Sequence, residues 1–300
     1  VSILEKLNVC MIGQTDDLTP ADKKIYALRD VTATVENVGL ITASITSKKI
    51  AEGSEGIVYD VKVGNGSTLP TYEKSKELAS KLLQTSKDFG QNAVAVLTDM
   101  SSPLGYAIGN WVEIKECIEI MDPAIKNSEQ SSDLIEVTLF LAGAMLEAAG
   151  KVSTIEEGIE KSRIMLESGA PLEKFIELVR IQGGDVNYIN NPSSYPEAKF
   201  RETITAATDG FVSKMDALTF GLAAVNLGCG RKTIEDKIDY SSSILLKKKL
   251  GDPVTAGDVI CEITGESAEK KESTKQMLVN GIEVSATKPI VKSRIIEVIN

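Results

Sequence analysis

A strand, a glycine-containing loop and a helix follow one another twice in the first half of this chain. The β-branched run Gly56–Val63 predicts the first strand, and Tyr72–Lys87 predicts the helix that follows it. Asn92–Thr98 and Asn110–Met121 repeat that order about 35 residues further along. Two such repeats predict βαβ units, so the strands run parallel and both following loops leave the same carboxyl edge of the sheet. Ligands bind at that edge in open α/β folds.

Helices are expected on either side of these strands. The first fifty residues have a helical pattern, with a helix start at Thr19-Pro20, and helices continue from about Ser131 to Arg180. A loop at Asn187–Pro196 precedes a β-rich section from Lys199, and Ala217–Leu227 predicts one apolar helix. The expected fold class is therefore α/β, with a helical portion and a mixed, largely parallel sheet flanked by helices.

The expected organisation has three parts. Residues 1–52 would form part of a helical domain, and residues 53–235 an α/β domain. Residues 236–300 would form a β-rich module, in which Gly251–Gly257 lies between short strands.

Composition excludes several classes of function. With 300 residues and a net charge of −10, the chain lacks the positive field that nucleic acids and anionic membranes require. It contains no histidine, which excludes Ser-His-Asp and Cys-His catalysis and imidazole-based zinc sites within this chain. No apolar run approaches the length of about 20 residues that spans a bilayer, and no signal-peptide pattern opens the chain. Free thiols in a cytoplasmic protein are expected from the wide spacing of Cys10, Cys117, Cys229 and Cys261.

The segment Tyr26–Lys49 places polar groups on an otherwise apolar helix that follows a turn. At about 100° per residue, the side chains that share one face within roughly 100° are Ile41, Ser44, Ile45 and Lys48. Burying a serine and a lysine beside isoleucines is unfavourable unless something pairs with them. This face therefore predicts that the serine and the lysine have polar partners, which a ligand or the protein itself could supply.

Arg29 lies just before that helix and could bring a second cation to the same pocket. Two interpretations stay open on spacing alone. In the first, Arg29, Ser44 and Lys48 face a ligand. In the second, Lys48 extends into water while Arg29 pairs with Asp30 or with a helix terminus.

Six sequence blocks carry a resemblance to a known family. They are IGQTDDLTPADKKIYALRDVTATV from Ile12, LITASITSKKIAEG from Leu40, YDVKVGNG from Tyr59, LTDMSSPLGYAIGNWVEIKE from Leu97, GLAAVNLGCGR from Gly221 and KKKLGDPVTAGDVI from Lys247. Together they resemble the pyrimidine-nucleoside phosphorylases, thymidine phosphorylase included, over nearly the whole chain. The resemblance implies a pentosyltransferase that splits uridine or thymidine with inorganic phosphate into a free base and a pentose 1-phosphate. It also implies that the last residues form the hammerhead-like module of that family.

The resemblance assigns the pyrimidine base to one set of residues. The set expected to bind substrate is Tyr26, Arg29, Ile41, Ser44, Ile45 and Lys48. Arg29 and Lys48 would act in catalysis by contacting the ring carbonyl oxygens, and Ser44 would contact the N3/O4 edge. Such donors stabilise the negative charge that builds on the departing base, and losing one typically costs about 3 kcal/mol.

The motif Asp60-Val-Lys62-Val-Gly64-Asn-Gly66 contains a GxG, which alone is a weak phosphate signal. Asp60 and Lys62 share one face of the strand, so we interpret them as a pair at a sheet end. In the loop that follows, the family usually has an aromatic residue where this chain has Thr68. The preference between uridine and thymidine therefore stays open.

The resemblance also implies a potassium ion, and no organic cofactor. Its ligands would be the backbone oxygens of Leu104 and Ala107 and the carboxylate of Glu116. Oxygen ligands suit a hard cation. On spacing alone, Glu116 is a solvated helix residue, and both interpretations stay open.

The family's phosphate-binding loop and its proposed general-acid histidine belong to a region of about one hundred residues upstream of the first block. No segment of this chain matches that region. We expect either a missing N-terminal piece that completes the fold or a truncated copy of the protein. The family also forms dimers through its helical domain, so a homodimer is expected, with a pyrimidine nucleoside and phosphate as ligands.

Two other functions are compatible with the sequence. The chain could be a non-catalytic relative that binds pyrimidines without the phosphate loop. A phosphoribosyltransferase of the anthranilate type shares the helical-plus-α/β architecture, but the block YALRDVTATV disfavours it.

Overall fold

The computed structural model describes residues 2–13, 15, 17–32, 34–125, 131–233 and 235–300. The chain divides into two units, each built from segments that are separate in the sequence. The first unit comprises Val1–Asp99, Glu136–Met165 and Arg294–Asn300, and the second comprises Met100–Ile135 and Leu166–Ser293.

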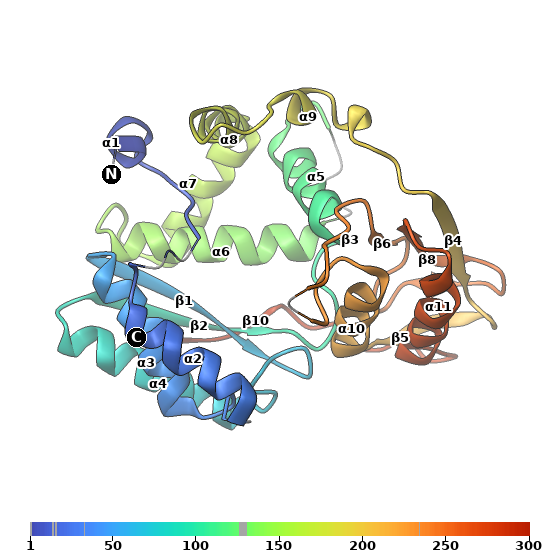
Figure 1. Ribbon diagram of the computed structural model, residues 1–300, viewed down its shortest axis with the longest axis horizontal. Coiled ribbons are helices and arrows are strands. Elements are labelled where there is room, and N and C mark those ends of the chain that lie inside the picture. The colour runs from blue at the N-terminus through green and yellow to red at the C-terminus, as the bar shows by residue number, and fades with distance from the viewer. Residues whose placement is uncertain (1, 14, 16, 33, 126–130, 234) are drawn as a thin grey trace. The chain divides into compact units, whose positions relative to one another are not determined.

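The first unit contains a three-stranded sheet with helices on both sides (Figure 1). Its strands are β1 (Gly56–Val63), β2 (Asn92–Asp99) and β10 (Ile295–Ile299). Its helices are α1 (Ser2–Leu7), α2 (Pro20–Thr32), α3 (Val38–Ala51) and α4 (Tyr72–Asp88), with most of α6 (Ser132–Ala148) and α7 (Ile155–Glu167). Strands β1 and β2 pair in parallel from Gly56↔Asn92 to Val63↔Asp99, and β10 pairs antiparallel with β2.

Burial explains the position of α4 on this sheet. Alternate residues of β1 are buried, and they form one core cluster with the apolar face of α4. That cluster includes Ile57, Tyr59, Val61, Val63, Leu78, Ala79, Leu82 and Leu83. Helix α4 begins after Thr71, whose side chain accepts a hydrogen bond from the backbone N–H of Lys74. The period of two along β1 and the helical period along α4 therefore bury the same apolar layer.

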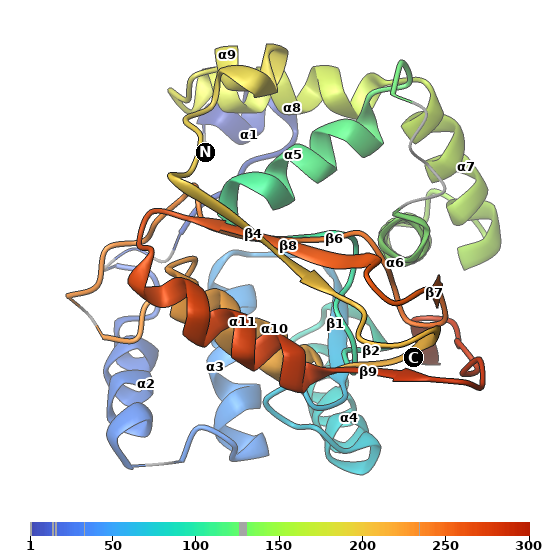
Figure 2. The same ribbon diagram turned by 90° about the vertical axis from the view of Figure 1, so that its right-hand side faces the viewer.

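The second unit contains two antiparallel sheets. One has the order β3 (Ala107–Ile108), β6 (Ser243–Leu246), β8 (Val259–Gly265), β4 (Phe200–Thr205), and the other β7 (Pro253–Val254), β5 (Gly210–Met215), β9 (Ile282–Ser285). Its helices are α5 (Asn110–Met121), α8 (Ala170–Ile181), α9 (Asn187–Asn190), α10 (Ala217–Leu227) and α11 (Glu269–Gly281), with a 3₁₀ turn at Pro192–Ser194. Figure 2 shows α10 and α11 side by side, with α11 against β4 and β8.

The predicted elements agree with the structure in most places. The parallel pairing of β1 with β2 is confirmed, and so is the α/β class. Among the described residues, the other strand pairs are antiparallel. The short strand β3 follows the second loop and pairs with β6, so the second strand–loop–helix repeat does not continue the parallel sheet.

Two local predictions are corrected by the structure. Tyr26 and Arg29 lie on α2, which extends to Thr32, and not in a turn before α3. The last segment includes the helix α11, which the β-rich prediction missed. Thr274, Leu278 and Gly281 recur at helical spacing and are buried, while most of the remaining α11 side chains are charged or polar.

The division into units cuts the chain at other places than residues 52 and 235. Helix α3 packs on α4, and β10 pairs with β2, so segments from both ends of the chain belong to the first unit. The three-part organisation stays a prediction.

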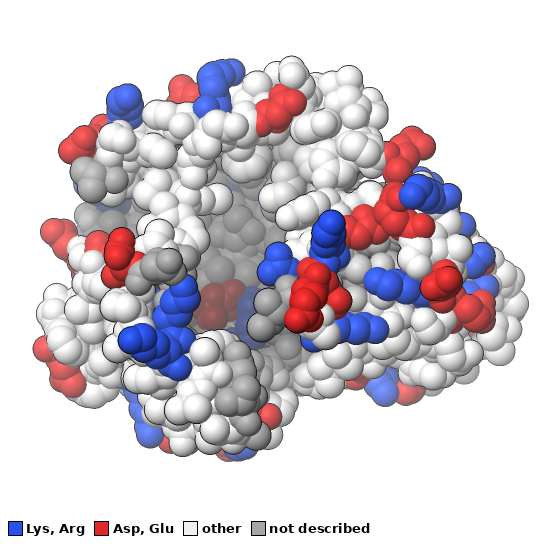
Figure 3. All heavy atoms as spheres, in the orientation of Figure 1, with Lys and Arg blue, Asp and Glu red and all other residues white. Residues whose placement is uncertain are grey.

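In the described part of the chain, we find no helix whose length and apolar character would let it cross a membrane. On the face shown in Figure 3, basic side chains are interspersed with acidic ones.

Candidate functional site

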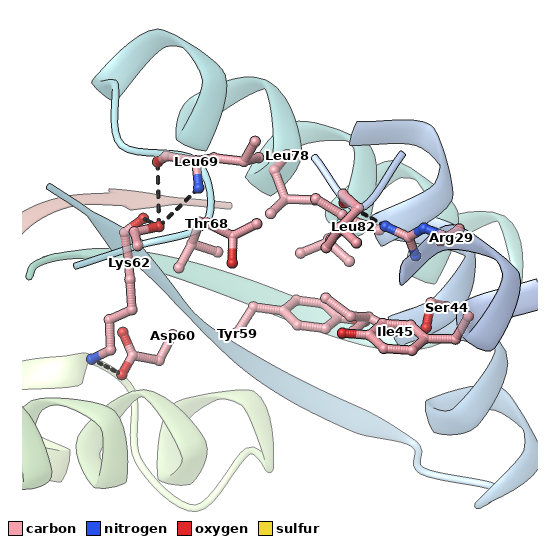
Figure 4. A pocket seen from close by; sticks show the side chains of 15 residues that line it. Arg29, Ser44, Ile45, Tyr59, Asp60, Lys62, Thr68, Leu69, Leu78 and Leu82 are labelled. Atoms are coloured by element: carbon pink, nitrogen blue, oxygen red, sulfur yellow. Dashed lines mark hydrogen bonds and ion pairs between the residues drawn. The ribbon is translucent and has the colours of Figure 1, made fainter. Parts of the chain in front are cut away.

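A pocket of about 330 Å³ lies in the first unit, bordered by α2, α3, β1, α4 and the loop after β1 (Figure 4). Five of the six residues predicted to bind substrate line it. They are Tyr26, Arg29, Ile41, Ser44 and Ile45. The sixth, Lys48, is not among the described residues that line the pocket.

Helix α3 presents three of the four residues of the predicted face to this pocket. Asn37 caps the helix by accepting a hydrogen bond from Leu40 N at 3.0 Å, which sets where the helical period begins. Ile41, Ser44 and Ile45 then fall on one face, as the spacing predicts, and Ser44 is only 7% exposed.

Arg29 is buried, with 3% of its surface exposed, and its guanidinium group is held by backbone oxygens. It donates to the carbonyl groups of Val35 at 2.5 Å, Leu40 at 3.2 Å and Thr34 at 3.4 Å. The guanidinium carbon lies 5.3 Å from the centre of the Tyr26 ring. Arg29 therefore holds the connection between α2 and α3 while it borders the pocket.

These contacts resemble the interpretation in which Arg29 pairs with a helix terminus, because one of them is made to the N-terminal turn of α3. Leu40 belongs to the first turn of α3, and Thr34 and Val35 lie in the segment just before it. The side chain of Asp30 lies outside the described residues. A guanidinium group has five N–H donors, and these three contacts use three of them.

Lys48 is paired rather than extended into water. Its ammonium group donates to Asp22 Oδ2 at 2.5 Å, to Ser44 O at 2.8 Å and to Ser44 Oγ at 3.0 Å. The side chains of Lys48 and Asp22 are 24% and 11% exposed. Asp22 is a site neighbour that sequence reasoning missed, and its position in the first turn of α2 was the available signal. In contrast, Lys49 pairs with Glu52 at 2.9 Å on the surface.

The other end of the pocket is polar. Lys62 Nζ donates to Asp60 Oδ2 at 2.5 Å and to Thr98 Oγ1 at 3.0 Å, and Thr98 donates to Asp60 Oδ1 at 2.5 Å. The expected pair of Asp60 and Lys62 at a sheet end is therefore confirmed. Thr98 joins it because Thr98 lies opposite Lys62 on the neighbouring strand β2. Asp60, Lys62 and Thr68 all line the pocket.

Apolar side chains form the remaining wall, and sequence reasoning missed them. Leu69, Leu78 and Leu82 line the pocket with the ring of Tyr59. Burial raises the pKa of Tyr59, whose hydroxyl lies 2.8 Å from Ser86 Oγ. The site thus combines apolar walls with the buried hydrogen-bonding groups of Arg29 and Ser44, an arrangement that suits a small, largely apolar ligand with carbonyl groups.

The loop that carries the predicted potassium ligands lies in the second unit. Glu116, on α5, is 7% exposed, so its interpretation as a solvated helix residue is wrong. Its Oε1 accepts from Tyr106 N and Ser131 Oγ, both at 2.7 Å, and its Oε2 accepts from Ala107 N at 3.2 Å. The carboxylate therefore anchors the loop through backbone N–H groups.

The donor set at this loop fits a hard cation in its chemistry. Ala107 and Glu116 line a cavity of about 260 Å³, and Leu104 is not among its described lining residues. Oε2 accepts one bond at 3.2 Å and so retains acceptor capacity. The described residues contain no cluster of three or more Cys, Asp or Glu side chains suited to a metal. A cation held here would depend mainly on backbone oxygens.

Comparison with known proteins places this arrangement in a family. Residues 1–172 match the family model "Glycosyl transferase family, a/b domain", and residues 211–285 match "Pyrimidine nucleoside phosphorylase C-terminal domain". The chain therefore belongs to this glycosyl transferase family and, within it, to the pyrimidine-nucleoside phosphorylases.

Curated relatives agree with that assignment. The chain is 40% identical over 286 residues to a pyrimidine-nucleoside phosphorylase of Staphylococcus haemolyticus. That alignment covers 95% of the chain and 65% of the relative. It is 42% identical over 258 residues to that of Bacillus subtilis, covering 86% of the chain and 58% of the relative. The Geobacillus stearothermophilus pyrimidine-nucleoside phosphorylase is 39% identical over 287 residues. That alignment covers 96% of the chain and 65% of the relative. The chain thus spans 58–65% of the length of these relatives.

Proposed function

We propose that this chain takes part in the phosphorolysis of pyrimidine nucleosides, as a pentosyltransferase, and that it carries the base-binding half of the site. The reaction would convert uridine or thymidine and inorganic phosphate into the free base and a pentose 1-phosphate. The observation that supports this most is the single pocket that brings Tyr26, Arg29 and Ser44 together with apolar walls. The relatives named pyrimidine-nucleoside phosphorylase support the choice of ligand.

The proposed chemistry depends on charge that builds on the departing base. Arg29 has two N–H donors beyond its three backbone contacts, and these would stabilise a ring carbonyl oxygen as it gains charge. Ser44 Oγ accepts from Lys48, which leaves its hydroxyl hydrogen available to donate to the base. Hydrogen bonds in such a chain strengthen one another, so Lys48 would support the charge through Ser44 or by direct contact.

The other ligands and partners are part of the same proposal. Backbone oxygens of Leu104 and Ala107 and the carboxylate of Glu116 would hold a potassium ion, which would organise the loop that they belong to. We infer that the phosphate-binding groups come from a piece outside these residues, and that two copies associate through the helical part. The four free thiols support a reducing, cytoplasmic setting.

Calorimetric titration of the chain with uracil and thymine tests the base-binding site. We expect saturable binding of the base, and loss of at least tenfold in affinity for Arg29→Ala, because a charged hydrogen bond contributes about 1.5–3 kcal/mol. Lys49→Ala is the control for the loss of a positive charge near the site. Lys49 follows Lys48 on α3, and its ammonium group pairs with Glu52 on the surface. Equal binding by Arg29→Ala and the parent chain would overturn the site assignment.

A spectrophotometric assay with uridine and thymidine, with and without phosphate, tests the reaction. Phosphate-dependent release of base supports the full proposal. Base binding without turnover at any phosphate concentration would limit this chain to the base-binding half. Absence of both binding and turnover would overturn the proposal.

A further inference from the structure

In the second unit, a lysine ammonium group is surrounded by oxygen atoms of a loop. Lys249 Nζ donates to the carbonyl oxygens of Pro103 at 2.9 Å and Gly105 at 2.5 Å, and to Asp133 Oδ2 at 2.8 Å. It also lies 5.2 Å from the centre of the Tyr106 ring. The Lys249 side chain is only 14% exposed. Carbonyl oxygens, a carboxylate and an aromatic face are the surroundings that a hard monovalent cation takes in a protein.

Carboxylates hold the same loop through its N–H groups. Asp133 Oδ1 accepts from Gly105 N at 3.3 Å while its other oxygen binds the ammonium group. Glu116 accepts from Tyr106 N at 2.7 Å and from Ala107 N at 3.2 Å. The loop is therefore fixed by a cation on two of its carbonyl groups and by two carboxylates on three of its N–H groups.

Gly105 shows how closely this loop is held. Its φ of +64° lies in the left-handed region, and a Cβ placed there would lie 2.6 Å from Glu116 Oε2. The backbone therefore passes directly against one anchoring carboxylate while its carbonyl group accepts from Lys249. The N–H and C=O groups of a buried backbone segment need hydrogen-bond partners, and Lys249, Asp133 and Glu116 supply them here.

We propose that Lys249 is a built-in cation that sets the conformation of residues 103–107. It is a positioning residue, because it acts on the loop and not on a ligand. The carbonyl groups it uses, those of Pro103 and Gly105, are neighbours of the Leu104 and Ala107 oxygens that were expected to bind potassium. Lys249 and a bound ion would then organise different carbonyl groups of one loop. Rescue by a small external cation separates this role from simple packing of the Lys249 side chain. Such a cation can replace the ammonium charge of Lys249, but it cannot replace the packed methylene groups.

The test is chemical rescue of Lys249→Ala in the full chain. Trp111, the only tryptophan of the sequence, lies in the first turn of α5, and its ring stacks on that of Tyr195 with the ring centres 4.2 Å apart. Its emission therefore reports on the packing of α5, the helix that follows the loop. We expect altered emission and a fall of about 5–10 °C in the unfolding midpoint, because a buried ion pair loses one partner. Potassium, ammonium and methylammonium chloride should restore both readouts in a saturable way, whereas choline chloride at equal ionic strength should not.

Two further variants make the test specific. Lys249→Arg keeps the charge and should need less rescue than the alanine variant. Lys248→Ala is the matched control, because Lys248 is the adjacent lysine and its ammonium group donates to Pro253 O at 3.0 Å. Its emission and midpoint should depend on the added cation no more than those of the parent chain do.

The proposal is overturned if Lys249→Ala keeps the parent emission and midpoint, or if small cations restore no more than choline does. If the alanine variant does not accumulate in folded form, refolding from urea in potassium chloride or choline chloride is the readout. Refolding in potassium alone supports the proposal, and failure in both, or equal recovery in both, overturns it.

Discussion

Gly143 of α6 and Gly158 of α7 meet where their helices cross, so closely that a Cβ on Gly158 would lie 2.6 Å from the carbonyl oxygen of Gly143. A Cβ on Gly143 would in turn lie 2.8 Å from Ile155 O and Ile159 N. Both glycines are buried, and neither has a side chain that could hold the helices apart. The crossing is therefore a backbone-to-backbone contact that only glycine permits at either position.

We expect Gly143→Ala and Gly158→Ala each to lower the free energy of unfolding by about 1–3 kcal/mol, because the added methyl group must displace backbone atoms. Gly221→Ala in α10 is the control, since a Cβ at that position meets no atom within 4 Å. Alanine there should be neutral or stabilising by about 0.5–1 kcal/mol. Differential scanning calorimetry of the three variants would decide this, and equal midpoints for all of them would contradict the prediction.

Arg29→Lys should fail to replace Arg29, although it keeps the charge. The guanidinium group donates to three carbonyl oxygens at once from three different nitrogen atoms. The donors of a lysine all sit on one nitrogen atom, so they do not match that geometry. We expect a lower unfolding midpoint together with weaker binding of uracil, by at least tenfold, measured by calorimetric titration. Binding equal to that of the parent chain would show that charge alone suffices.

Asp239 should make stability depend on pH in the acid range. Burial raises the pKa of its carboxyl, but donors from Ser242, Ser241 and Glu266 N outweigh burial and hold the pKa below its ordinary value. Such a carboxylate contributes stability above the ordinary pKa and loses it as pH falls through the lowered one. We expect Asp239→Asn to lower the free energy of unfolding by about 1–3 kcal/mol at neutral pH and to flatten its fall below about pH 4.

Urea unfolding of the parent chain and of Asp239→Asn at neutral and acid pH measures this difference. Asp185→Asn serves as the control, because Asp185 is exposed and accepts one backbone bond, from Asn187 N at 2.9 Å. A parent chain and Asp239→Asn variant with the same acid dependence would refute the assignment to Asp239.

Cys229 and Cys261 should resist alkylation while the chain is folded. Burial raises the pKa of both thiols to about 12, so almost none of either is thiolate near neutral pH. Mass spectrometry after iodoacetamide treatment near pH 8 should find both unmodified in the native chain and both modified after denaturation. Rapid native labelling of either residue would show that its thiol is accessible.

Local sequence patterns were sufficient for much of the fold. The β-branched runs of β1 and β2 and the helical spacing of α4, α5 and α10 each follow from a period that neighbouring residues maintain without distant partners. The shared face of Ile41, Ser44 and Ile45 could be predicted for the same reason. Helix α11 was missed because its apolar residues are sparse, and their burial depends on contact with α10, which lies far away in the sequence.

The sequence by itself determined most of the elements, the shared face of Ile41, Ser44 and Ile45 on α3, and the family to which the chain is similar. Only the tertiary structure decided which polar groups satisfy one another. Arg29 bonds to the segment before α3, Lys48 pairs with Asp22, and Glu116 is buried against the backbone of its loop. The physical reason is that helical and strand periods are local, whereas the partner of a buried charge is set by packing between segments that are distant in the chain.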